Sequence, residues 1–578
     1  MSTSTAPPIL PIRAQVRAAI DRAWQRAEAS GVLPPWPDET ARTVVEVERP
    51  ADPSHGDIAS NLALKLARPY RMAPLAIANA IADELRAEAG TEPPTTPVAT
   101  VDVAPPGFLN LRLADGALEA TVAAVLADPG AWGRVAATRD RSVNVEFVSA
   151  NPTGPLHVGN ARGAFIGDLL SRVLEAGGQR VTREYYFNDV GGQIPNLGAS
   201  VAAIHRGEPV PDDGYHGDYV KDLAAAVTPA SWAEATAPGV DTNGFLGHRA
   251  AGIVREQIER SLAALGVRFD VWTSEGSLHE SGWVSRAIDR LRAADQVYEQ
   301  DGALWFRSTA FGDDKDRVII RSNGEPTYFA ADIGYVTEKF SRGFDHLIYI
   351  WGADHHGTVA RERNAAEAMG YDREAVEMKL YSWVRFVRDG VEASMSKRAG
   401  EFITLDELLA EVGVDAARWF FASRAATTGI DFDIEVMRGQ REALERGDYE
   451  TAGRNPVYYV QYAHARIASI LRKATEAGLS RAEGVIGQLS GGPEAALARA
   501  VARFPEVIED AVEAEETHGV TAYATELATT FHAFYRDARV VDPDEPARSA
   551  ARLALAEATR ITLANALGLL GISAPDAM

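Results

Sequence analysis

Apolar residues in the central part of this chain follow a strand-then-helix rhythm. Residues 142–148 alternate as a short β-branched run, and a helical stripe follows in which Phe165, Leu169 and Val173 are spaced four residues apart. Gly177 comes directly after the stripe, where glycine often ends a helix. A strand, a loop and a helix in this order predict one βα unit of a parallel sheet.

A second set of runs resumes after residue 300. Residues 347–351 are continuously apolar, which is typical of a strand covered on both faces. Residues 303–306, 317–320 and 327–332 have the composition of further strands in this half of the sheet. Residues from about 200 to 290 interrupt the alternation with a loop and an amphipathic helix, so we expect an insertion there.

The two ends of the chain differ from its centre. Before residue 125, helical patterns near 10–30 and 72–88 accompany β-branched runs at 43–47 and 98–103, which predicts a separate α/β unit. From about residue 405 the pattern is almost wholly helical. We therefore predict a multi-domain α/β protein with an N-terminal α/β domain (1–125), a parallel-sheet domain (126–404, insertion about 200–290) and a C-terminal all-α helical bundle (405–578).

Composition narrows the function classes. The chain has 578 residues, 46% of them hydrophobic and 24% charged, as in ordinary globular proteins. Its formal net charge of −23 argues against a protein that coats nucleic acid through its global charge, although local basic patches remain open. The acidic excess is most simply explained by solubility.

The sequence contains no cysteine, which excludes disulfides, cysteine nucleophiles and thiolate zinc sites. No apolar run approaches the ~18 residues of a membrane span. The first residues lack the basic start and apolar core of a secretory signal. We therefore expect a cytoplasmic protein without a membrane partner.

The loop at residues 152–160, Pro-Thr-Gly-Pro-Leu-His-Val-Gly-Asn, joins the first central strand to its helix. It places His157, Gly159 and Asn160 at the helix entrance, where free N–H groups and partial positive charge suit a phosphate. The loop matches neither the P-loop nor the dinucleotide-binding pattern. Taken alone, an ordinary loop with a surface histidine explains it equally well.

Two further segments carry candidate chemistry. The loop 393–400 holds Lys397 beside Arg398, and a flexible lysine can follow developing phosphate charge, although a basic surface loop is the simpler explanation. Asp354, His355 and His356 are consecutive, but no further ligand lies at helix-pair spacing, so no metal site is expected there.

Aromatic residues crowd the start of a helix predicted by Asn455-Pro456, a polar cap followed by proline. Tyr458, Tyr459 and Tyr462 lie there, with cationic residues just beyond. Such rings can stack on unpaired bases. Tyrosines packed in the core of a helical bundle are the alternative.

The ordered set of segments resembles the arginyl-tRNA synthetases, class I enzymes of the bacterial type, from end to end. The loop at 157–160 resembles their HIGH motif and residues 395–398 their KMSK motif. The segments that carry the resemblance are 56–61, 107–110, 145–160, 311–317, 324–332, 352–357, 395–400, 455–463 and the end of the chain.

The resemblance implies a Rossmann-like catalytic domain and a two-step reaction. ATP and L-arginine would form arginyl-adenylate and diphosphate, and the arginyl group would then pass to the 2′-hydroxyl of the terminal adenosine of tRNA(Arg), releasing AMP. Mg²⁺ would accompany ATP, held mostly by its phosphates, with no tightly bound cofactor. We expect a monomer.

The same resemblance assigns the nucleotide site. His157 and Asn160 would contact the α-phosphate, and Lys397 the departing diphosphate. Position 394, usually lysine in the family motif, is serine here, so no role is assigned to it. The other residues implied in ATP binding are Pro155, Gly159, His355, Met395 and Ser396.

For the amino acid, the resemblance implies Glu146 and Asp332 as guanidinium acceptors, with Tyr328 lining the pocket, and Asn151 and Asp354 near the amino-acid end. Carboxylates can accept parallel N–H bonds from a guanidinium, which a lysine ammonium supplies less well. Glu146 lies between two apolar residues, so we expect a cationic partner for it.

For tRNA, the resemblance implies Phe108 and Asn110 in the N-terminal domain, and Tyr458, Tyr462, Tyr535 and Met578 at the anticodon loop. Two alternatives remain open at this stage. The chain could be a synthetase for another amino acid, or a tRNA-binding relative without catalysis.

Overall fold

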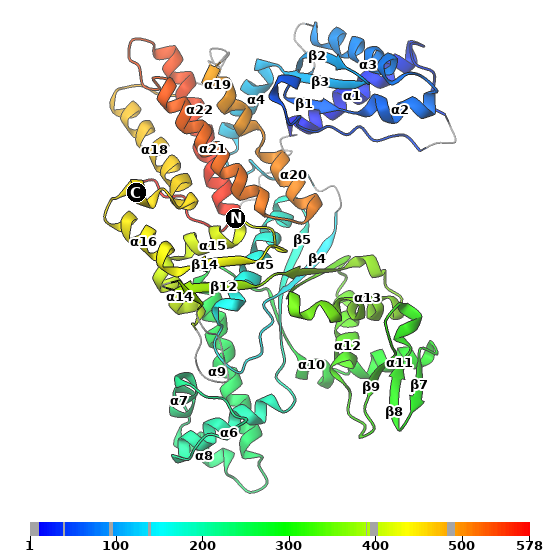
Figure 1. The fold of residues 1–578 in the computed structure, drawn as a ribbon, viewed down its shortest axis with the longest axis vertical. Coiled ribbons are helices and arrows are strands. Elements are labelled where there is room, and N and C mark those ends of the chain that lie inside the picture. Colours follow the sequence, from blue (N-terminus) through cyan, green and yellow to red (C-terminus); the bar gives the residue numbers. More distant parts are fainter. Residues whose placement is uncertain are drawn as a thin grey trace.

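The computed structural model describes residues 11–37, 41–91, 96–136, 140–388, 390–392, 403–481 and 492–578. The molecule is elongated (Figure 1). The N-terminal domain lies at one end, a parallel sheet occupies the middle, and a helical insertion forms the other end. The C-terminal helices pack above the sheet, on the side of the N-terminal domain.

The central sheet has five parallel strands in the order β11-β10-β4-β5-β6. Their bounds are β4 Ser142–Phe147, β5 Arg180–Phe187, β6 Val271–Ser274, β10 His346–Gly352 and β11 Val376–Tyr381. The predicted strands at 142–148 and 347–351 are thus confirmed. Because the chain runs outward from β4 to β6 and then returns to β10, the strand order reverses between β4 and β10, where ligands bind in such sheets.

Helix α5 (Val158–Ala176) connects β4 to β5 and is capped at Gly177, as the pattern predicted. Four helices separate β5 from β6: α6 Gln193–Arg206, α7 Asp218–Ala225, α8 Pro229–Ala235 and α9 Thr242–Ala264. Strand β6 lies inside the range expected for the insertion, yet it belongs to the central sheet.

A side lobe follows β6. Helices α10 (Glu275–Glu280) and α11 (Trp283–Ala293) lead into an antiparallel sheet of β7 Val297–Gln300, β8 Ala303–Phe306 and β9 Arg317–Ile320. The strands predicted at 303–306 and 317–320 therefore exist, but their assignment to the parallel sheet was wrong.

The strand predicted at 327–332 is also wrong, because these residues begin helix α12 (Tyr328–Ser341). The side chain of Thr327 caps this helix by accepting a hydrogen bond from the Ala330 N–H. Phe329, Ile333 and Val336 lie buried on one helical stripe. A 3₁₀ segment (Ala353–Thr358) and α13 (Val359–Ala368) complete the lobe.

The N-terminal domain has a three-stranded antiparallel sheet in the order β1-β3-β2. Its elements are α1 Ile12–Ala29, β1 Ile58–Ser60, α2 Leu62–Tyr70, α3 Pro74–Ala89, β2 Val98–Ala104 and β3 Phe108–Leu113, with α4 Asp115–Ala127 beyond. Helices near 10–30 and 72–88 are confirmed. The strand predicted at 43–47 is wrong: only Glu48 bridges to Ala59, and Val44 is exposed.

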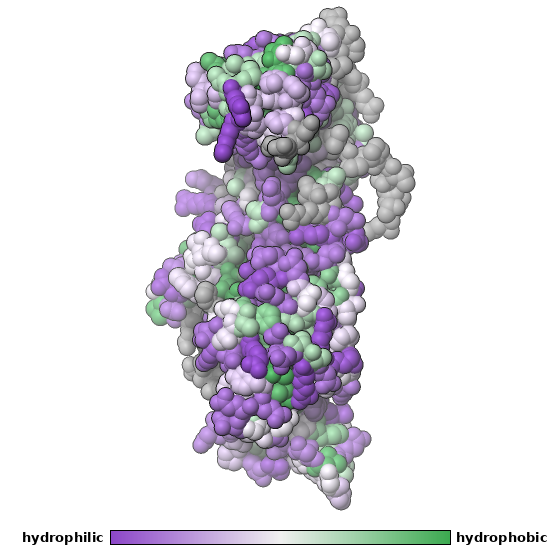
Figure 2. Space-filling view, turned by 90° about the vertical axis from the view of Figure 1, so that its right-hand side faces the viewer, coloured by the Kyte–Doolittle hydropathy of each residue, from purple (hydrophilic) through white to green (hydrophobic). Residues whose placement is uncertain are grey.

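After β11, the strands β12 (Val384–Arg388), β13 (Val391–Glu392) and β14 (Ile430–Asp433) form a small sheet, with the first two C-terminal helices between β13 and β14 in the sequence. The helices are α14 Leu405–Val412, α15 Val414–Ala422, α16 Ile434–Glu445, α17 Tyr449–Ala452, α18 Pro456–Glu476, α19 Gly492–Ala502, α20 Phe504–Ala514, α21 His518–Asp537 and α22 Pro546–Leu569. Asn455 caps α18 as predicted, accepting from the Val457 N–H at 3.2 Å. Figure 2 shows a largely hydrophilic face with only small, scattered hydrophobic patches.

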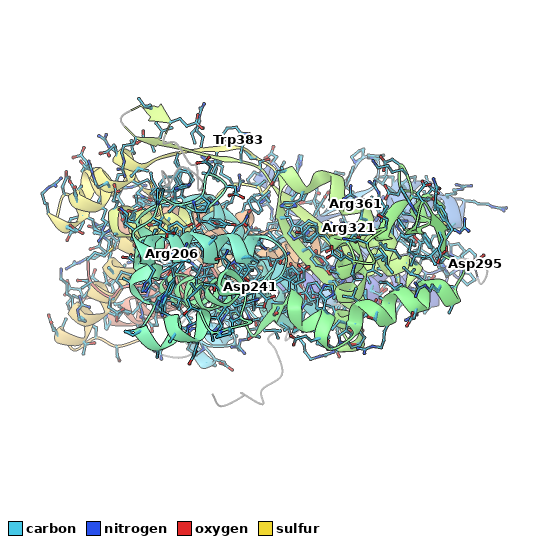
Figure 3. All side chains as sticks on the ribbon, turned by 90° about the horizontal axis from the view of Figure 1, so that it is seen from below. Arg206, Asp241, Asp295, Arg321, Arg361 and Trp383 are labelled. Atoms are coloured by element: carbon cyan, nitrogen blue, oxygen red, sulfur yellow. The ribbon has the colours of Figure 1, made fainter. Side chains whose placement is uncertain are left out.

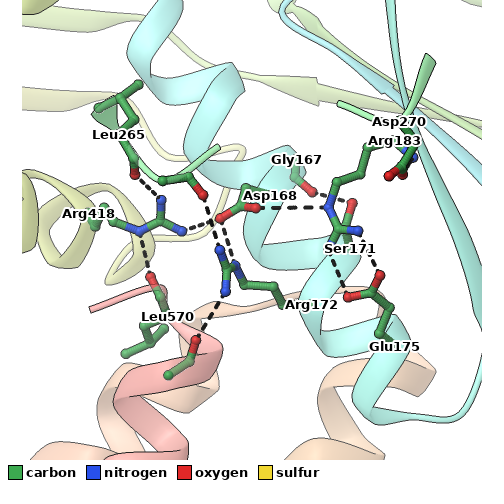
Figure 4. A network of polar contacts seen from close by, with 12 residues as sticks. Gly167, Asp168, Ser171, Arg172, Glu175, Arg183, Leu265, Asp270, Arg418 and Leu570 are labelled. Atoms are coloured by element: carbon green, nitrogen blue, oxygen red, sulfur yellow. Dashed lines mark hydrogen bonds and ion pairs between the residues drawn. The ribbon is translucent and has the colours of Figure 1, made fainter. Parts of the chain in front are cut away.

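A buried arginine ties three parts of the molecule to helix α5 (Figure 4). Arg418 on α15 donates to the carbonyls of Leu265 after α9 (2.7 Å) and Leu570 after α22 (2.8 Å), and pairs with Asp168 on α5. The last carbonyls of helices lack intrahelical partners, so this guanidinium satisfies two helix ends at once. The helix that starts at His157 is thereby fixed against the insertion and the bundle.

Candidate functional site

The loop at 152–160 ends at the first turn of α5, with His157 as the N-cap. The side-chain oxygen of Asn160 accepts a hydrogen bond from the His157 N–H at 3.2 Å. A Cβ at Gly159 would lie 2.7 Å from the His157 imidazole, so glycine is needed for the ring to lie over the first turn. The imidazole and the positive end of the α5 dipole converge here, which suits an anion, although the Val158 and Asn160 N–H groups already donate within the chain.

The predicted partners Lys397, Met395 and Ser396 lie outside the described residues. The chain that follows them is described and lies against the His157 loop. The Val158 N–H donates to the Ile403 carbonyl at 3.1 Å, and the Leu405 N–H donates to the Leu156 carbonyl at 3.0 Å. This backbone pairing brings residues distant in sequence to the helix entrance.

Glu146 on β4 forms a buried ion pair. Its Oε2 lies 2.6 Å from Lys339 Nζ on α12, and both side chains are almost completely buried. The ammonium group also lies over the rings of Tyr335 (4.3 Å) and Tyr349 (4.0 Å). The second oxygen of Glu146 accepts from Ser149 Oγ at 3.1 Å. Glu146 thus has the cationic partner that its burial requires, and this partner is a residue of the chain, as for a buried strand acid with a local partner.

The backbone between Glu146 and the His157 loop is strained. Val148 (φ 67°) and Ser149 (φ 40°) both occupy the left-handed region, which is uncommon for residues other than glycine and costly for valine. The turn directs Ser149 Oγ toward Glu146, and Tyr185 Oη donates to the Ala150 carbonyl at 2.8 Å. The surrounding contacts therefore hold an unfavourable backbone that orients Glu146.

Four carboxyl groups gather in this region: Glu146, Glu275 on α10, Asp332 on α12 and Glu362 on α13. We call them the acid cluster. Burial, followed by the charges of Glu275 and Glu146, raises the pKa of Asp332 to about 7. Burial also raises the pKa of Glu275, and burial together with Asp332 raises the pKa of Glu362 well above its usual range. The cluster thus holds more negative charge than its surroundings stabilise.

Cations only partly compensate this charge. Arg361, labelled in Figure 3, lowers the pKa of Asp332 and Glu362 through its charge. Within the described part of the chain, however, Asp332 and Glu362 accept no hydrogen bond and form no ion pair. A buried carboxylate without a partner favours a cation from outside the chain. Glu275 is better supported, because Tyr186 Oη donates to it at 2.7 Å.

The other residues predicted for arginine surround this region at the carboxyl ends of β4 and β10. Tyr328 is 61% exposed and lies one helical turn before Asp332. Asn151 donates to Gln193 Oε1 at 3.0 Å. Asp354 and His355 are exposed after β10, with Oδ2 and Nε2 3.7 Å apart. The sequence did not identify Lys339, Tyr186, Glu275 or Glu362.

Asn188 and Asp189 follow β5 and are engaged within the chain. Asp189 accepts from Ser274 Oγ at 2.6 Å and from the Gly276 N–H at 2.9 Å, which fixes α10 against β5. Among the described residues, no group of three or more His, Asp or Glu side chains is arranged to hold a metal ion. No helix in the described ranges is long and apolar enough to span a membrane.

A second site lies in the helical bundle, where a cavity of about 290 Å³ opens between α17, α18 and α21; we call it the bundle pocket. It brings together three of the predicted tRNA contacts, Tyr458, Tyr462 and Met578. Tyr535 does not line it, although its ring lies 5.4 Å from the Arg466 guanidinium. The lining residues are Leu444, Tyr449, Ala452, Gly453, Tyr458, Tyr459, Tyr462, Arg466, His532 and Met578.

The predicted contacts of the N-terminal domain lie on β3. Phe108 and Asn110 alternate with the buried Leu109 and Leu111. Both therefore belong to the half-exposed face of the sheet, where a partner can reach them.

Family comparisons cover these three parts. Residues 12–113 match the model described as arginyl tRNA synthetase N terminal domain. Residues 121–209 and 246–424 match tRNA synthetases class I (R), catalytic domain, and residues 460–578 match the DALR anticodon binding domain. An arginine–tRNA ligase of Moorella thermoacetica is 45% identical, covering 98% of each chain. The chain belongs to the arginyl-tRNA synthetase family.

Solved structures agree with this family. A putative arginyl-tRNA synthetase from Campylobacter jejuni is 32% identical and covers 81% of this chain and all of its own, with a TM-score of 0.71. The Thermus thermophilus arginyl-tRNA synthetase covers 97% of this synthetase and all of its own chain, with a TM-score of 0.73 and 23% identity, a likeness of fold.

Proposed function

We propose that this synthetase ligates L-arginine to tRNA(Arg) through arginyl-adenylate, with the acid cluster selecting the guanidinium. The observation that carries the proposal is the half-buried Asp332, which has no hydrogen-bond or ion-pair partner among the described residues and whose pKa the charge of Glu146 helps to raise. ATP and arginine first give the adenylate and diphosphate. The arginyl group then passes to the 2′-hydroxyl of the terminal adenosine, and AMP leaves.

The first step needs no protein nucleophile, because the arginine carboxylate attacks the α-phosphate. Catalysis then consists of positioning and of stabilising charge on phosphate oxygens. His157 and Asn160, at the N-terminus of α5, contact the α-phosphate, and Lys397 contacts the departing diphosphate. Mg²⁺ enters with ATP, bound mostly by its phosphates. The remaining nucleotide contacts are Pro155, Gly159, His355, Met395 and Ser396.

Arginine selection follows from the acid cluster. Lys339 occupies Oε2 of Glu146, so Glu146 offers Oε1, now held by Ser149, while Asp332 offers a free carboxylate. A planar guanidinium can donate to both acids in one plane, whereas an ammonium is a compact point charge. Tyr328 lines this pocket, and Asn151 and Asp354 contact the amino-acid end.

tRNA contacts the N-terminal domain and the helical bundle. Phe108 and Asn110 contact the corner of the molecule, and Tyr458, Tyr462, Tyr535 and Met578 contact its anticodon loop. Aromatic rings beside a cation suit unpaired bases there. We further propose that the synthetase acts as a cytoplasmic monomer.

Arginine charging of total tRNA tests this function, with lysine and canavanine as competitors. His157→Ala should lower kcat by roughly 10²–10³-fold, because it removes a donor to the transition-state phosphate. His205→Ala, in the insertion helix α6, is the matched control and should charge normally. Unchanged charging by the His157 variant would overturn its role. A tRNA-binding relative without catalysis would bind tRNA yet form no arginyl-tRNA.

A further inference from the structure

His532 on α21 lines the bundle pocket and has no explained partner. Both of its ring nitrogens are buried, and neither has a hydrogen-bond partner among the described residues. Buried polar groups almost always have such a partner, and leaving one unmade costs about 1–3 kcal/mol. The exception therefore calls for a ligand or another explanation.

A second buried histidine in the same bundle shows the ordinary arrangement. The Nδ1 of His464 on α18 lies 2.8 Å from the Pro575 carbonyl, which fixes the C-terminal tail. His464 thus has a hydrogen-bonding partner for one of its two nitrogens, whereas neither nitrogen of His532 has one among the described residues. The His532 ring packs against Tyr459 at 5.0 Å, Phe531 at 5.5 Å and Tyr462 at 6.2 Å.

The pocket around His532 has the chemistry of a nucleobase site. The Arg466 guanidinium lies 4.6 Å from the Tyr462 ring centre and donates to the Tyr462 hydroxyl at 2.7 Å. In the described residues Arg466 has no acidic partner, so its charge remains available. Ring faces beside a guanidinium stack on bases. The volume, near the lower end of the ~300–1,000 Å³ range of ligand pockets, suits one base.

The protonation state of His532 defines what it can offer. Burial, followed by the charge of Arg466, lowers the pKa of His532 to about 4. At neutral pH the imidazole is therefore uncharged, with one nitrogen as donor and the other as acceptor. Such a group distinguishes base edges, because each base presents its own pattern of donors and acceptors.

We propose that His532 determines specificity by hydrogen-bonding the edge of one anticodon-loop base inserted into the bundle pocket. This inference rests on the proposed function and on the anticodon-binding family of residues 460–578. The tyrosines and Met578 enclose the base, and they accept any base of suitable size. His532 supplies the directional contact that stacking lacks.

The test uses the full chain and tRNA(Arg) transcripts in which each anticodon-loop nucleotide is replaced in turn. His532→Phe keeps an aromatic ring and removes both nitrogens. At one loop position, the preference of the wild type for the native base should fall by about 10-fold or more, as loss of a good base contact does. The KM for native tRNA should rise by a similar factor, while kcat and the KM for arginine stay unchanged.

The matched control is His205→Phe, since His205 also stacks on an aromatic ring, Trp232, but lies in the insertion. It should leave every preference unchanged. Equal losses on all transcripts with His532→Phe, or no loss, would overturn the inference. Wild-type chain that charges no transcript would instead refute the proposed function.

A measurement on the wild type avoids any folding defect of the variant. Binding of the anticodon stem–loop RNA should shift the imidazole ¹⁵N resonances of His532, because one nitrogen gains a partner. The resonances of His205 serve as the reference. Resonances of His532 that stay in place when the stem–loop is bound would equally overturn the inference.

Discussion

The acid cluster and the bundle pocket, which we propose as the sites for arginine and for an anticodon-loop base, have opposite chemistry. The first holds four carboxyl groups behind a parallel sheet, where burial and mutual repulsion raise the pKa of Asp332 to about 7. The second holds stacked tyrosines, an arginine without an acidic partner among the described residues, and a histidine whose pKa is lowered to about 4. One is suited to a small cation and the other to a flat ring.

The difference teaches how each site obtains selectivity. In the acid cluster, we propose that charge is the selecting feature, because a cation stabilises buried carboxylates that repel one another. In the bundle pocket, charge plays a smaller part, because every base presents a π-face and only its edge differs. Changes in one site should therefore leave the substrate of the other untouched.

The largest expected difference between the effects on arginine and on tRNA comes from Asp332→Asn. Losing the charged acceptor should cost about 2–3 kcal/mol, or roughly 30- to 150-fold in kcat/KM for arginine. The KM values for ATP and tRNA should not change. Arg466→Met is the reciprocal variant and should raise the KM for tRNA alone. Steady-state kinetics with each substrate varied in turn test this. If either variant changed the constants for arginine and for tRNA by the same factor, the two sites would not act separately.

The second prediction concerns pH. Because the folded pKa of Asp332 is raised from its ordinary value of 3.8 to about 7, the acid is largely protonated below neutral pH. The kcat/KM for arginine should then fall roughly tenfold per pH unit below about 7, since a cation binds the ionised form. Ionisation also removes stability as pH rises through this range, because the folded chain holds the proton more tightly.

Pre-steady-state arginine binding, measured across pH 5.5–8, tests this decrease, because the range extends ~1 unit or more either side of the expected pKa of Asp332. In Asp332→Asn, arginine binding should no longer weaken as the pH falls. The pH dependence of tRNA binding should be the same in both proteins. If arginine binding by the asparagine variant weakened at low pH as it does in the wild type, the titrating group would be another residue.

The smallest effects come from a matched pair of hydroxyl deletions. Tyr186 Oη donates to Glu275, and Tyr449 Oη donates to the Met578 carbonyl, each at 2.7 Å. Tyr186→Phe should raise only the KM for arginine, and Tyr449→Phe only the KM for tRNA, each by about fivefold for a bond worth ~1 kcal/mol. A variant that raised the other KM instead would contradict its assignment to that site.

The central fold could be predicted because its elements are long and strongly patterned. The apolar runs that became β4 and β10, and the stripe of α5 ending at Gly177, depend on local periodicity alone. Residues 43–47 show the limit of this reasoning. They have a β-branched composition, but they lack a paired strand on either side, which composition does not reveal.

Because residues 327–332 were predicted as a strand, Lys339 was not identified as a residue of the candidate site. A strand over these residues would end at Asp332, at the edge of the sheet, and would give no reason to consider the residues that follow. As helix α12 it continues to Lys339, and Asp332, Tyr335 and Lys339 follow one another at three- and four-residue spacing. That polar stripe beside the apolar stripe of the same helix is the signal that would have identified the partner of Glu146. Glu275 and Glu362 gave no such signal, since only tertiary packing brings them to the cluster.

The Leu570 carbonyl, which accepts a hydrogen bond from Arg418, lies at the C-terminal end of α22. Arg172 on α5 likewise donates to Gly568 in the last turn of α22. During synthesis, α5 and the His157 loop leave the ribosome long before these partners exist. A nascent chain in which α22 has not yet folded would lack both contacts, so the folding of α22 supplies the final anchor of the helix that begins after His157.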